Sequence, residues 1–129
     1  MPLVRIDAVK GRTPEDIRKL LDAAHRAVVS AFKVPQRDRY QVYHEHPADH
    51  VIAEDTGLGI TRTEKVVIVS VTIRPRAEAA KLDFYRELCR ELEAACGIAP
   101  SDVIVSITIN SDADCSFGNG TAQFVTGEL

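Results

Sequence analysis

The sequence predicts an α+β domain in which a strand–helix–strand unit occurs twice. Residues 2–46 and 65–109 run in the same order: an apolar strand, an amphipathic helix, a proline-containing turn with an aspartate, and a second strand. Such crossovers within one sheet are nearly always right-handed, so we expect a four-stranded mixed sheet with both helices on one face. The 129 residues suit one compact domain, residues 1–129.

The first unit begins with an apolar strand and continues into a capped helix. Residues 2–9 are rich in branched side chains and are followed by a lysine–glycine pair, which is typical of a strand that ends in a turn. Thr13 is suited to cap the helix and Pro14 to occupy its first position. Apolar residues then recur at helical spacing up to residues 33–35, and residues 38–46 alternate like a half-buried strand.

The second unit repeats this order with a stronger strand signal. Residues 65–73 (KVVIVSVTI) are apolar on both faces, as expected for a central strand. A second helix follows Arg76 and ends at Gly97, a residue favoured just after a helix. The last strand covers residues 103–109.

Two segments lie outside the units. Residues 47–64 form a long connection in which we expect one short strand at residues 51–53. The C-terminal extension, residues 110–129, is expected to form short strands or to wrap a neighbouring chain. One layer of helices leaves the other sheet face bare, so we also expect oligomerisation through that face.

Composition excludes several classes of function. A formal net charge of −3 and an aromatic content of 5% do not suit a nucleic-acid-binding protein. The beginning, MPLVRIDAV, lacks the layout of a signal peptide, and no apolar run is long enough to span a bilayer. Three cysteines without C-x-x-C spacing are typical of a reducing compartment. We therefore expect a cytoplasmic protein with no membrane or nucleic-acid partner.

Pro2 is the first candidate for chemistry. A small second residue permits removal of Met1, which would leave Pro2 with a free secondary amine. Burial lowers and a nearby carboxylate raises the pKa of such an amine, so it can act as base, acid or Schiff-base nucleophile. The alternative is that Met-Pro is merely a common chain start.

Arg74, Arg76 and Asp38 could complete a site around this amine. Arg74 and Arg76 follow the strongest strand and share one side of an extended segment, so both could hold one carboxylate. Asp38 would approach the beginning of the first strand and keep a protonated Pro2 cationic. The alternatives are two solvated arginines at a turn and an ordinary turn aspartate.

The motifs, taken together, resemble a known family over nearly the whole chain. The series PLVRID, TPEDIRKLLDAAHRAVVSAFKVPQRDRYQ, AEDTGLG, VTIRPR, GIAPSDVIV and NSDADCSFGNGTAQFVTGEL is similar, in order, to malonate semialdehyde decarboxylase of the tautomerase superfamily. The resemblance implies a homotrimer that decarboxylates a small 3-oxo acid without metal or cofactor. Its proline, aspartate and arginine pair correspond to Pro2, Asp38, Arg74 and Arg76.

The resemblance also implies an apolar pocket wall in the tail, formed by Phe117, Phe124 and Leu129. Cys115 stands where the family pattern has an aromatic residue, which bears on pocket shape. Two alternatives to decarboxylation remain. One is enol–keto tautomerisation or hydration of an unsaturated 2-oxo acid by a neutral Pro2, and the other is a non-catalytic trimeric binding module that retains Met1.

The histidines are weaker candidates. His25 lies next to the apolar stripe of the first helix, where a packed or surface role is the commoner one. His44 and His46 would share a strand face, and with His50, Glu45 and Asp49 they could suggest a metal site. No supporting pattern of further ligands accompanies them, so we expect no metal centre.

Overall fold

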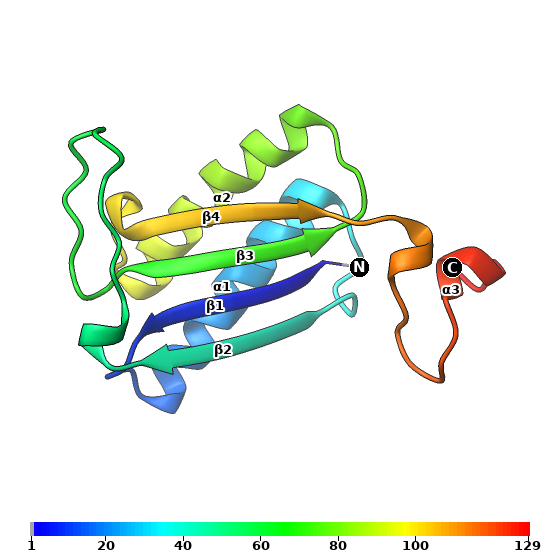
Figure 1. Ribbon diagram of the computed structural model, residues 1–129, viewed down its shortest axis with the longest axis horizontal. Coiled ribbons are helices and arrows are strands. Elements are labelled where there is room, and N and C mark those ends of the chain that lie inside the picture. Colours follow the sequence, from blue (N-terminus) through cyan, green and yellow to red (C-terminus); the bar gives the residue numbers. More distant parts are fainter. Residues whose placement is uncertain (1) are drawn as a thin grey trace.

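A computed structural model describes residues 2–129 as a four-stranded mixed sheet with two long helices on one face (Figure 1). The sheet has the strand order β2-β1-β3-β4. Strands β1 and β2 are parallel, β3 and β4 are parallel, and β1 and β3 are antiparallel. In chain order the main elements are β1 (Leu3–Val9), α1 (Pro14–Phe32), β2 (Tyr40–His46), β3 (Val67–Ile73), α2 (Glu78–Cys96) and β4 (Val103–Ile109). The predicted fold class is confirmed.

The two units are related by a constant offset in sequence. Strand β3 follows β1, and helix α2 follows α1, by 64 residues at both ends, as from Leu3 to Val67 and from Pro14 to Glu78. The second strands depart from this offset by one residue, because Leu3 pairs with Tyr40 whereas Val67 pairs with Val103. Arg39 is the additional residue in the first unit.

The helices begin and end as the sequence predicts. The Thr13 side chain accepts a hydrogen bond from the backbone N–H of Asp16 at 3.1 Å, and Pro14 occupies the first turn. Helix α1 ends at Lys33, which has the left-handed conformation (φ 56°), and α2 ends at Gly97 in the same conformation (φ 66°). Only glycine adopts this conformation without steric cost, so Lys33 is the unusual cap.

The core lies between the sheet and the two helices. Along β3 the side chains at alternate positions from Val67 to Ile73 are buried, and along β1 Val4, Ile6 and Ala8 are buried. Helix residues such as Leu20, Phe84 and Leu88 cover them. The opposite face of the sheet carries exposed apolar side chains, including Leu3 (40% exposed) and Val42 (41%). A bare face of this kind is what the prediction of oligomerisation rests on.

The segments outside the units differ from expectation. Residues 110–129 form a 3₁₀ turn (Asp112–Asp114) and a one-turn helix, α3 (Gln123–Thr126), so the prediction of short C-terminal strands is wrong. Gly118, Asn119 and Gly120 all have positive φ, and strands require negative φ. The short strand expected at residues 51–53 is absent as well, because the chain turns just before it in a 3₁₀ helix (Ala48–His50).

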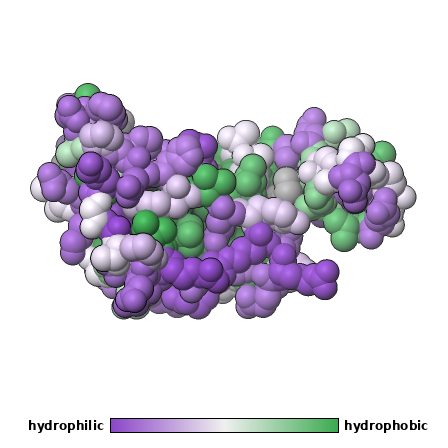
Figure 2. All heavy atoms as spheres, turned by 90° about the horizontal axis from the view of Figure 1, so that it is seen from below, coloured by the Kyte–Doolittle hydropathy of each residue, from purple (hydrophilic) through white to green (hydrophobic). Residues whose placement is uncertain are grey.

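Residues 110–129, which we call the C-terminal arm, project from the sheet at the end where β1 begins (Figure 1). Figure 2 shows apolar atoms gathered on the arm, a mostly hydrophilic body, and a hollow between the two. Within residues 2–129, no helix combines the length and the apolar character needed to cross a membrane.

Candidate active site

A cavity of about 640 Å³ lies where the C-terminal arm faces the end of the sheet. Three segments form its wall: the loop from α1 to β2, the residues that follow β3, and the arm. The lining residues are Lys33, Val34, Pro35, Arg37, Asp38, Tyr40, Arg74, Arg76, Phe117, Gln123, Phe124, Glu128 and Leu129. Four of them are cationic and two are carboxylates, so the cavity suits an anion.

Strand registers place Pro2 at this end of the sheet. Leu3 pairs with Tyr40 on one side and with Thr72 on the other. Continuing both registers by one residue sets Pro2 between Arg39 and Ile73. Arg39 directly follows Asp38 in the sequence, and Ile73 directly precedes Arg74. Pro2 is buried and is not itself among the lining residues. Removal of Met1 concerns a residue outside the described part of the chain.

Asp38 lies in the tight turn that leads from α1 into β2. Its backbone N–H donates to the carbonyl of Pro35 at 3.0 Å, which closes the turn and brings the half-buried side chain to the cavity wall. The turn is also held from behind by His25, which is 5% exposed and whose Nε2 donates to the carbonyl of Gln36 at 2.7 Å. His25 is therefore a packed helix residue outside the cavity wall.

Arg74 links the end of β3 to the C-terminal arm. Its Nη1 donates to Asp112 Oδ1 at 3.0 Å, and its guanidinium carbon lies 3.6 Å from the ring centroid of Phe124. The Nε–H is buried and has no hydrogen-bond partner within residues 2–129. An unpaired buried donor on a cation is costly unless a ligand accepts from it.

Arg76 lies two residues further on, on the same cavity wall. Its Nη1 donates to the carbonyl of Pro75 at 3.1 Å. Burial lowers the pKa of Arg76 from its ordinary value, the nearby Arg74 lowers this pKa further, and Asp38 acts in the opposite direction. A partly desolvated guanidinium beside a second one gains from a bound anion.

Aromatic rings form the apolar part of the wall. Phe117 packs edge-on against Phe124, with 5.3 Å between ring centroids, and in a tilted arrangement against Tyr40, with 5.5 Å between centroids. The amide of Gln123 accepts from the backbone N–H of Phe117 at 2.9 Å and donates to the carbonyl of Gly118 at 3.0 Å, which shapes the arm. Cys115 is buried but does not line the cavity, so its effect on pocket shape is indirect.

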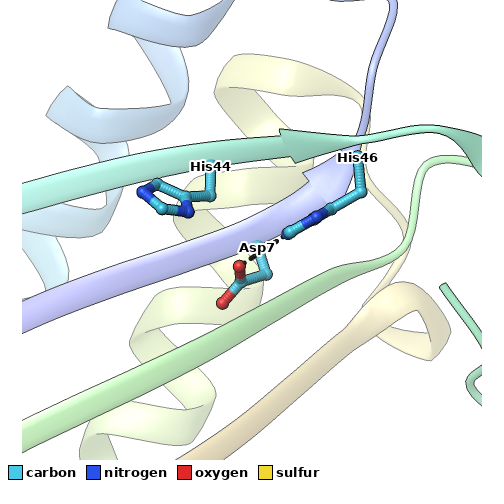
Figure 3. A group of neighbouring side chains, drawn as sticks. All are labelled: Asp7, His44 and His46. Carbon is cyan, nitrogen blue, oxygen red and sulfur yellow. Dashed lines mark hydrogen bonds and ion pairs between the residues drawn. The ribbon is translucent and has the colours of Figure 1, made fainter. Parts of the chain in front are cut away.

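The structure brings most of the sequence candidates together. The same cavity is lined by six of them: Asp38, Arg74, Arg76, Phe117, Phe124 and Leu129. Sequence reasoning missed Lys33, Arg37, Tyr40, Gln123 and Glu128 on the same wall. Lys33 could have been noticed in the sequence, because the residue just after a helix is often glycine and here it is a lysine. His44 and His46 lie elsewhere, on the helix-free face near the other end of β1 (Figure 3).

Comparison with known proteins agrees with this arrangement. Two family models, both described as tautomerase enzyme, match residues 38–118 and 2–60. The probable tautomerase YrdN of Bacillus subtilis (strain 168) is 57% identical over 129 residues, covering 100% of each chain. The probable tautomerase YusQ of the same organism is 28% identical over 126 residues, covering 97% of this chain and 99% of the relative.

Solved structures give the same result. Malonate semialdehyde decarboxylase, studied for decarboxylase and hydratase activities, shares 51% identity with a TM-score of 0.97, covering 98% of both chains. FG41 malonate semialdehyde decarboxylase inhibited by 3-bromopropiolate shares 42% identity with a TM-score of 0.94, covering 98% of this chain and 97% of that one. A fused 4-OT, a symmetric trimer, shares 25% sequence identity with a TM-score of 0.79, covering 97% of this chain and 98% of that one.

The family match over residues 38–118 and the 57% identity to a curated relative along the whole chain lead to one conclusion. This chain belongs to the tautomerase family of enzymes.

Proposed function

We propose that this protein decarboxylates malonate semialdehyde, or a similar small 3-oxo acid, with Pro2 as general acid or Schiff-base nucleophile. The observation that carries the proposal is the cavity in which Asp38, Arg74 and Arg76 meet at the end of the sheet where β1 begins. The similarity to two malonate semialdehyde decarboxylase structures, at 51% and 42% identity, supports this choice of substrate.

Binding would place the substrate carboxylate against Arg74 and Arg76. The unpaired Nε–H of Arg74 and the partly desolvated guanidinium of Arg76 are donors whose desolvation a carboxylate would offset. Their grip does not itself speed the loss of carbon dioxide, because it stabilises the charged ground state at least as well as the transition state. We therefore assign them to orientation, which turns the breaking bond out of the carbonyl plane.

Pro2 would supply the electron sink. The cationic amine can protonate the aldehyde oxygen, whereas the neutral amine, after it has lost its proton, can condense with the aldehyde to an iminium, with loss of water. When the bond between C2 and the carboxylate carbon breaks, its electron pair moves toward that carbon–oxygen or carbon–nitrogen double bond, and carbon dioxide leaves. Protonation at C2, followed by hydrolysis of any iminium, gives acetaldehyde. Asp38 would favour the cationic amine.

The apolar wall would serve the same step. Phe117, Phe124 and Leu129 line the same cavity as the cationic residues, and the Phe124 ring stacks on the Arg74 guanidinium. Such a wall lowers the local dielectric, which strengthens the interactions of Pro2 and the arginines with charge on the substrate. No metal or cofactor is part of the proposed reaction.

We also propose that the chain assembles as a homotrimer through the helix-free face of the sheet. A related fused 4-OT is a symmetric trimer at 25% identity. The exposed Leu3 and Val42 on that face give an apolar surface for a neighbouring chain to cover. Sedimentation equilibrium tests this part: a monomer at all concentrations would exclude it.

The decisive experiment has two stages. Intact mass spectrometry first establishes whether Met1 is removed, since a retained or formylated methionine blocks the amine of Pro2. The purified protein is then assayed with malonate semialdehyde beside phenylenolpyruvate. Acetaldehyde formation that is lost when the amine is acylated supports the proposal, and undiminished turnover after acylation contradicts it.

A second candidate is enol–keto tautomerisation, or hydration of an unsaturated 2-oxo acid. It is favoured by the 57% identity to a probable tautomerase. This reaction uses Pro2 as a neutral base, so the pKa of Pro2 separates the two candidates. A pKa above the roughly 8 of a free α-amino group favours the general acid, and one well below it favours the base. Retention of Met1 would instead support a non-catalytic binding module.

A further inference from the structure

Three metal-ligating side chains meet on the helix-free face of the sheet, away from the cavity (Figure 3). Asp7 of β1 is paired directly with His44 of β2, and His46 follows two residues later on the same side of its strand. Each offers one ligand atom, and these atoms all lie within 4.8 Å of one another. We propose that Asp7, His44 and His46 bind a divalent transition-metal ion of the zinc class.

The donor set matches this class of ion. Two imidazoles and a carboxylate bind Zn²⁺ and its neighbours at about 2.0–2.2 Å, whereas Mg²⁺ and Ca²⁺ prefer oxygen ligands alone. Ligands at such distances stand roughly 3.3 Å apart around a tetrahedral ion. His46 Nε2 already lies 2.7 Å from Asp7 Oδ1 in a hydrogen bond, and no two of the three ligand atoms are more than 4.8 Å apart, so small side-chain rotations would reach that spacing. A metal ion would take the place of the shared proton.

The backbone holds these ligands in place. Asp7 and His44 lie inside paired strands, and His46 ends β2, where its backbone carbonyl accepts from Lys10 N at 2.8 Å. In the single chain the Asp7 and His46 side chains are 24% and 33% exposed, which leaves room for water as a fourth ligand. The metal proposal therefore requires that the neighbouring chains of the proposed trimer leave this end of the helix-free face accessible. All three ligands come from one chain, so binding at one ion per chain needs no partner.

Arg5 is the competitor at this site. Its Nη2 donates to His44 Nδ1 at 2.7 Å, and its Nε lies 3.5 Å from Asp7 Oδ2. The guanidinium therefore occupies the acceptor groups that an ion would use. Its removal leaves the three ligands in place and takes away a positive charge that repels the ion, so Arg5→Gln is expected to strengthen metal binding.

The site is separate from the proposed active site. Asp7 lies four residues along β1 from Leu3, which at about 3.3 Å per residue is roughly 13 Å from the end of the strand that faces Pro2. Metal binding is consequently not required for turnover. A failure of the metal proposal and a failure of the decarboxylase proposal would therefore be seen in different measurements.

The test uses untagged full-length protein, because a histidine tag would bind the same ions. Zn²⁺ binding is measured by competition with a chromogenic chelator, and Co²⁺ is used as a spectroscopic probe of coordination. We expect one ion per chain, visible Co²⁺ bands, and a loss of affinity in His46→Ala larger than the roughly 10–100-fold that loss of an outer partner costs. His50→Ala is the matched control, since His50 is exposed and outside the group.

Two further variants make the result specific. His44→Ala should weaken binding as His46→Ala does, whereas Arg5→Gln should tighten it by about tenfold, through loss of a nearby like charge. Circular dichroism and thermal unfolding verify that each variant is folded. Zn²⁺ affinity that survives both histidine substitutions, or that falls equally in His50→Ala, would overturn the proposal, as would the absence of Co²⁺ bands.

Discussion

The two ends of the sheet are built from equivalent residues of the two units, yet only one end has the features of an active site. Under the offset of 64 residues, Arg74 and Arg76 correspond to Lys10 and Arg12. Each basic pair follows a first strand, and each lines a cavity, of about 640 Å³ at the Arg74 end and about 370 Å³ at the Lys10 end. A basic pair beside a cavity is therefore a property of the repeated fold rather than a sign of catalysis.

The difference lies in what surrounds each pair. Asp102, the counterpart of Asp38, is 1% exposed, and its carboxylate accepts from the backbone N–H and the hydroxyl of Thr63. It anchors the connecting loop, whereas Asp38 reaches the cavity wall. Val66, the counterpart of Pro2, is a buried residue within the chain whose nitrogen is an amide. The comparison teaches that the arm and the aspartate at the cavity wall, added to a common frame, distinguish the ends, and that Pro2 would add an amine there if Met1 is removed.

The strongest test of this contrast removes the ring of Pro2. If Met1 is removed, Pro2→Ala replaces a secondary amine held by its ring with a freely rotating primary one, and we expect it mainly to lower kcat, by up to the roughly 10²–10⁴-fold that a positioned general acid contributes. The effect on KM should be small, because the arginines still hold the carboxylate. Steady-state kinetics with malonate semialdehyde measures both parameters, and equal changes in the two would contradict the assignment.

The two aspartates should separate activity from stability. Asp38→Asn is expected to lower kcat by about 10–100-fold, because loss of a neighbouring carboxylate lowers the pKa of an amine by about 1–2 units and so reduces its cationic fraction. The free energy of unfolding should change little. Asp102→Ala removes a buried carboxylate and its two hydrogen bonds from Thr63, and hydrogen bonds to a charged group are worth about 1.5–3 kcal/mol, so it should lower the free energy of unfolding by about 2–3 kcal/mol. Turnover per folded molecule should be normal in that variant. Urea unfolding and kinetics on both variants give the answer, and a reversed pattern would end the comparison.

The basic pairs allow a matched test of substrate binding. Arg74→Ala should raise KM by about 10-fold to 100-fold, from loss of a charged hydrogen bond worth about 1.5–3 kcal/mol, and should lower kcat as well through poorer orientation. Lys10→Ala, at the equivalent position of the other cavity, should leave both parameters unchanged. Equal changes of KM and kcat in the two variants would mean that these positive charges act through the electrostatic field of the whole protein and not by contact with the substrate.

Local patterns were enough to predict the frame, whereas long-range placement was not. Strand alternation, helical spacing, the Thr13 cap and the Gly97 end all depend on neighbouring residues, so they could be predicted from sequence. The C-terminal arm could not, because its shape depends on positive φ angles and on contacts such as that of Asp112 with Arg74. Asp7 was missed for the same reason: its two histidine neighbours are on another strand, and no sequence spacing connects them.

The helix ends provide the finest contrast between the two halves. Lys33 and Gly97 occupy equivalent left-handed positions, and only Lys33 lines the larger cavity. Gly97→Ala meets no atom within 4 Å, so its cost is conformational alone, and the free energy of unfolding should fall by about 1 kcal/mol.

Lys33→Gly should change stability by less than about 0.5 kcal/mol, since relief of the left-handed strain is offset by greater freedom of the unfolded chain. It removes a cation from the cavity wall, so KM should rise by about 2–5-fold, as for loss of an exposed charge pair worth up to about 1 kcal/mol. Thermal unfolding and KM measured on the same preparations separate the two effects. If Lys33→Gly were clearly stabilising and left KM unchanged, the left-handed conformation of Lys33 would have no connection with substrate binding. The difference between Lys33 and Gly97 at the two helix ends would then have no functional meaning.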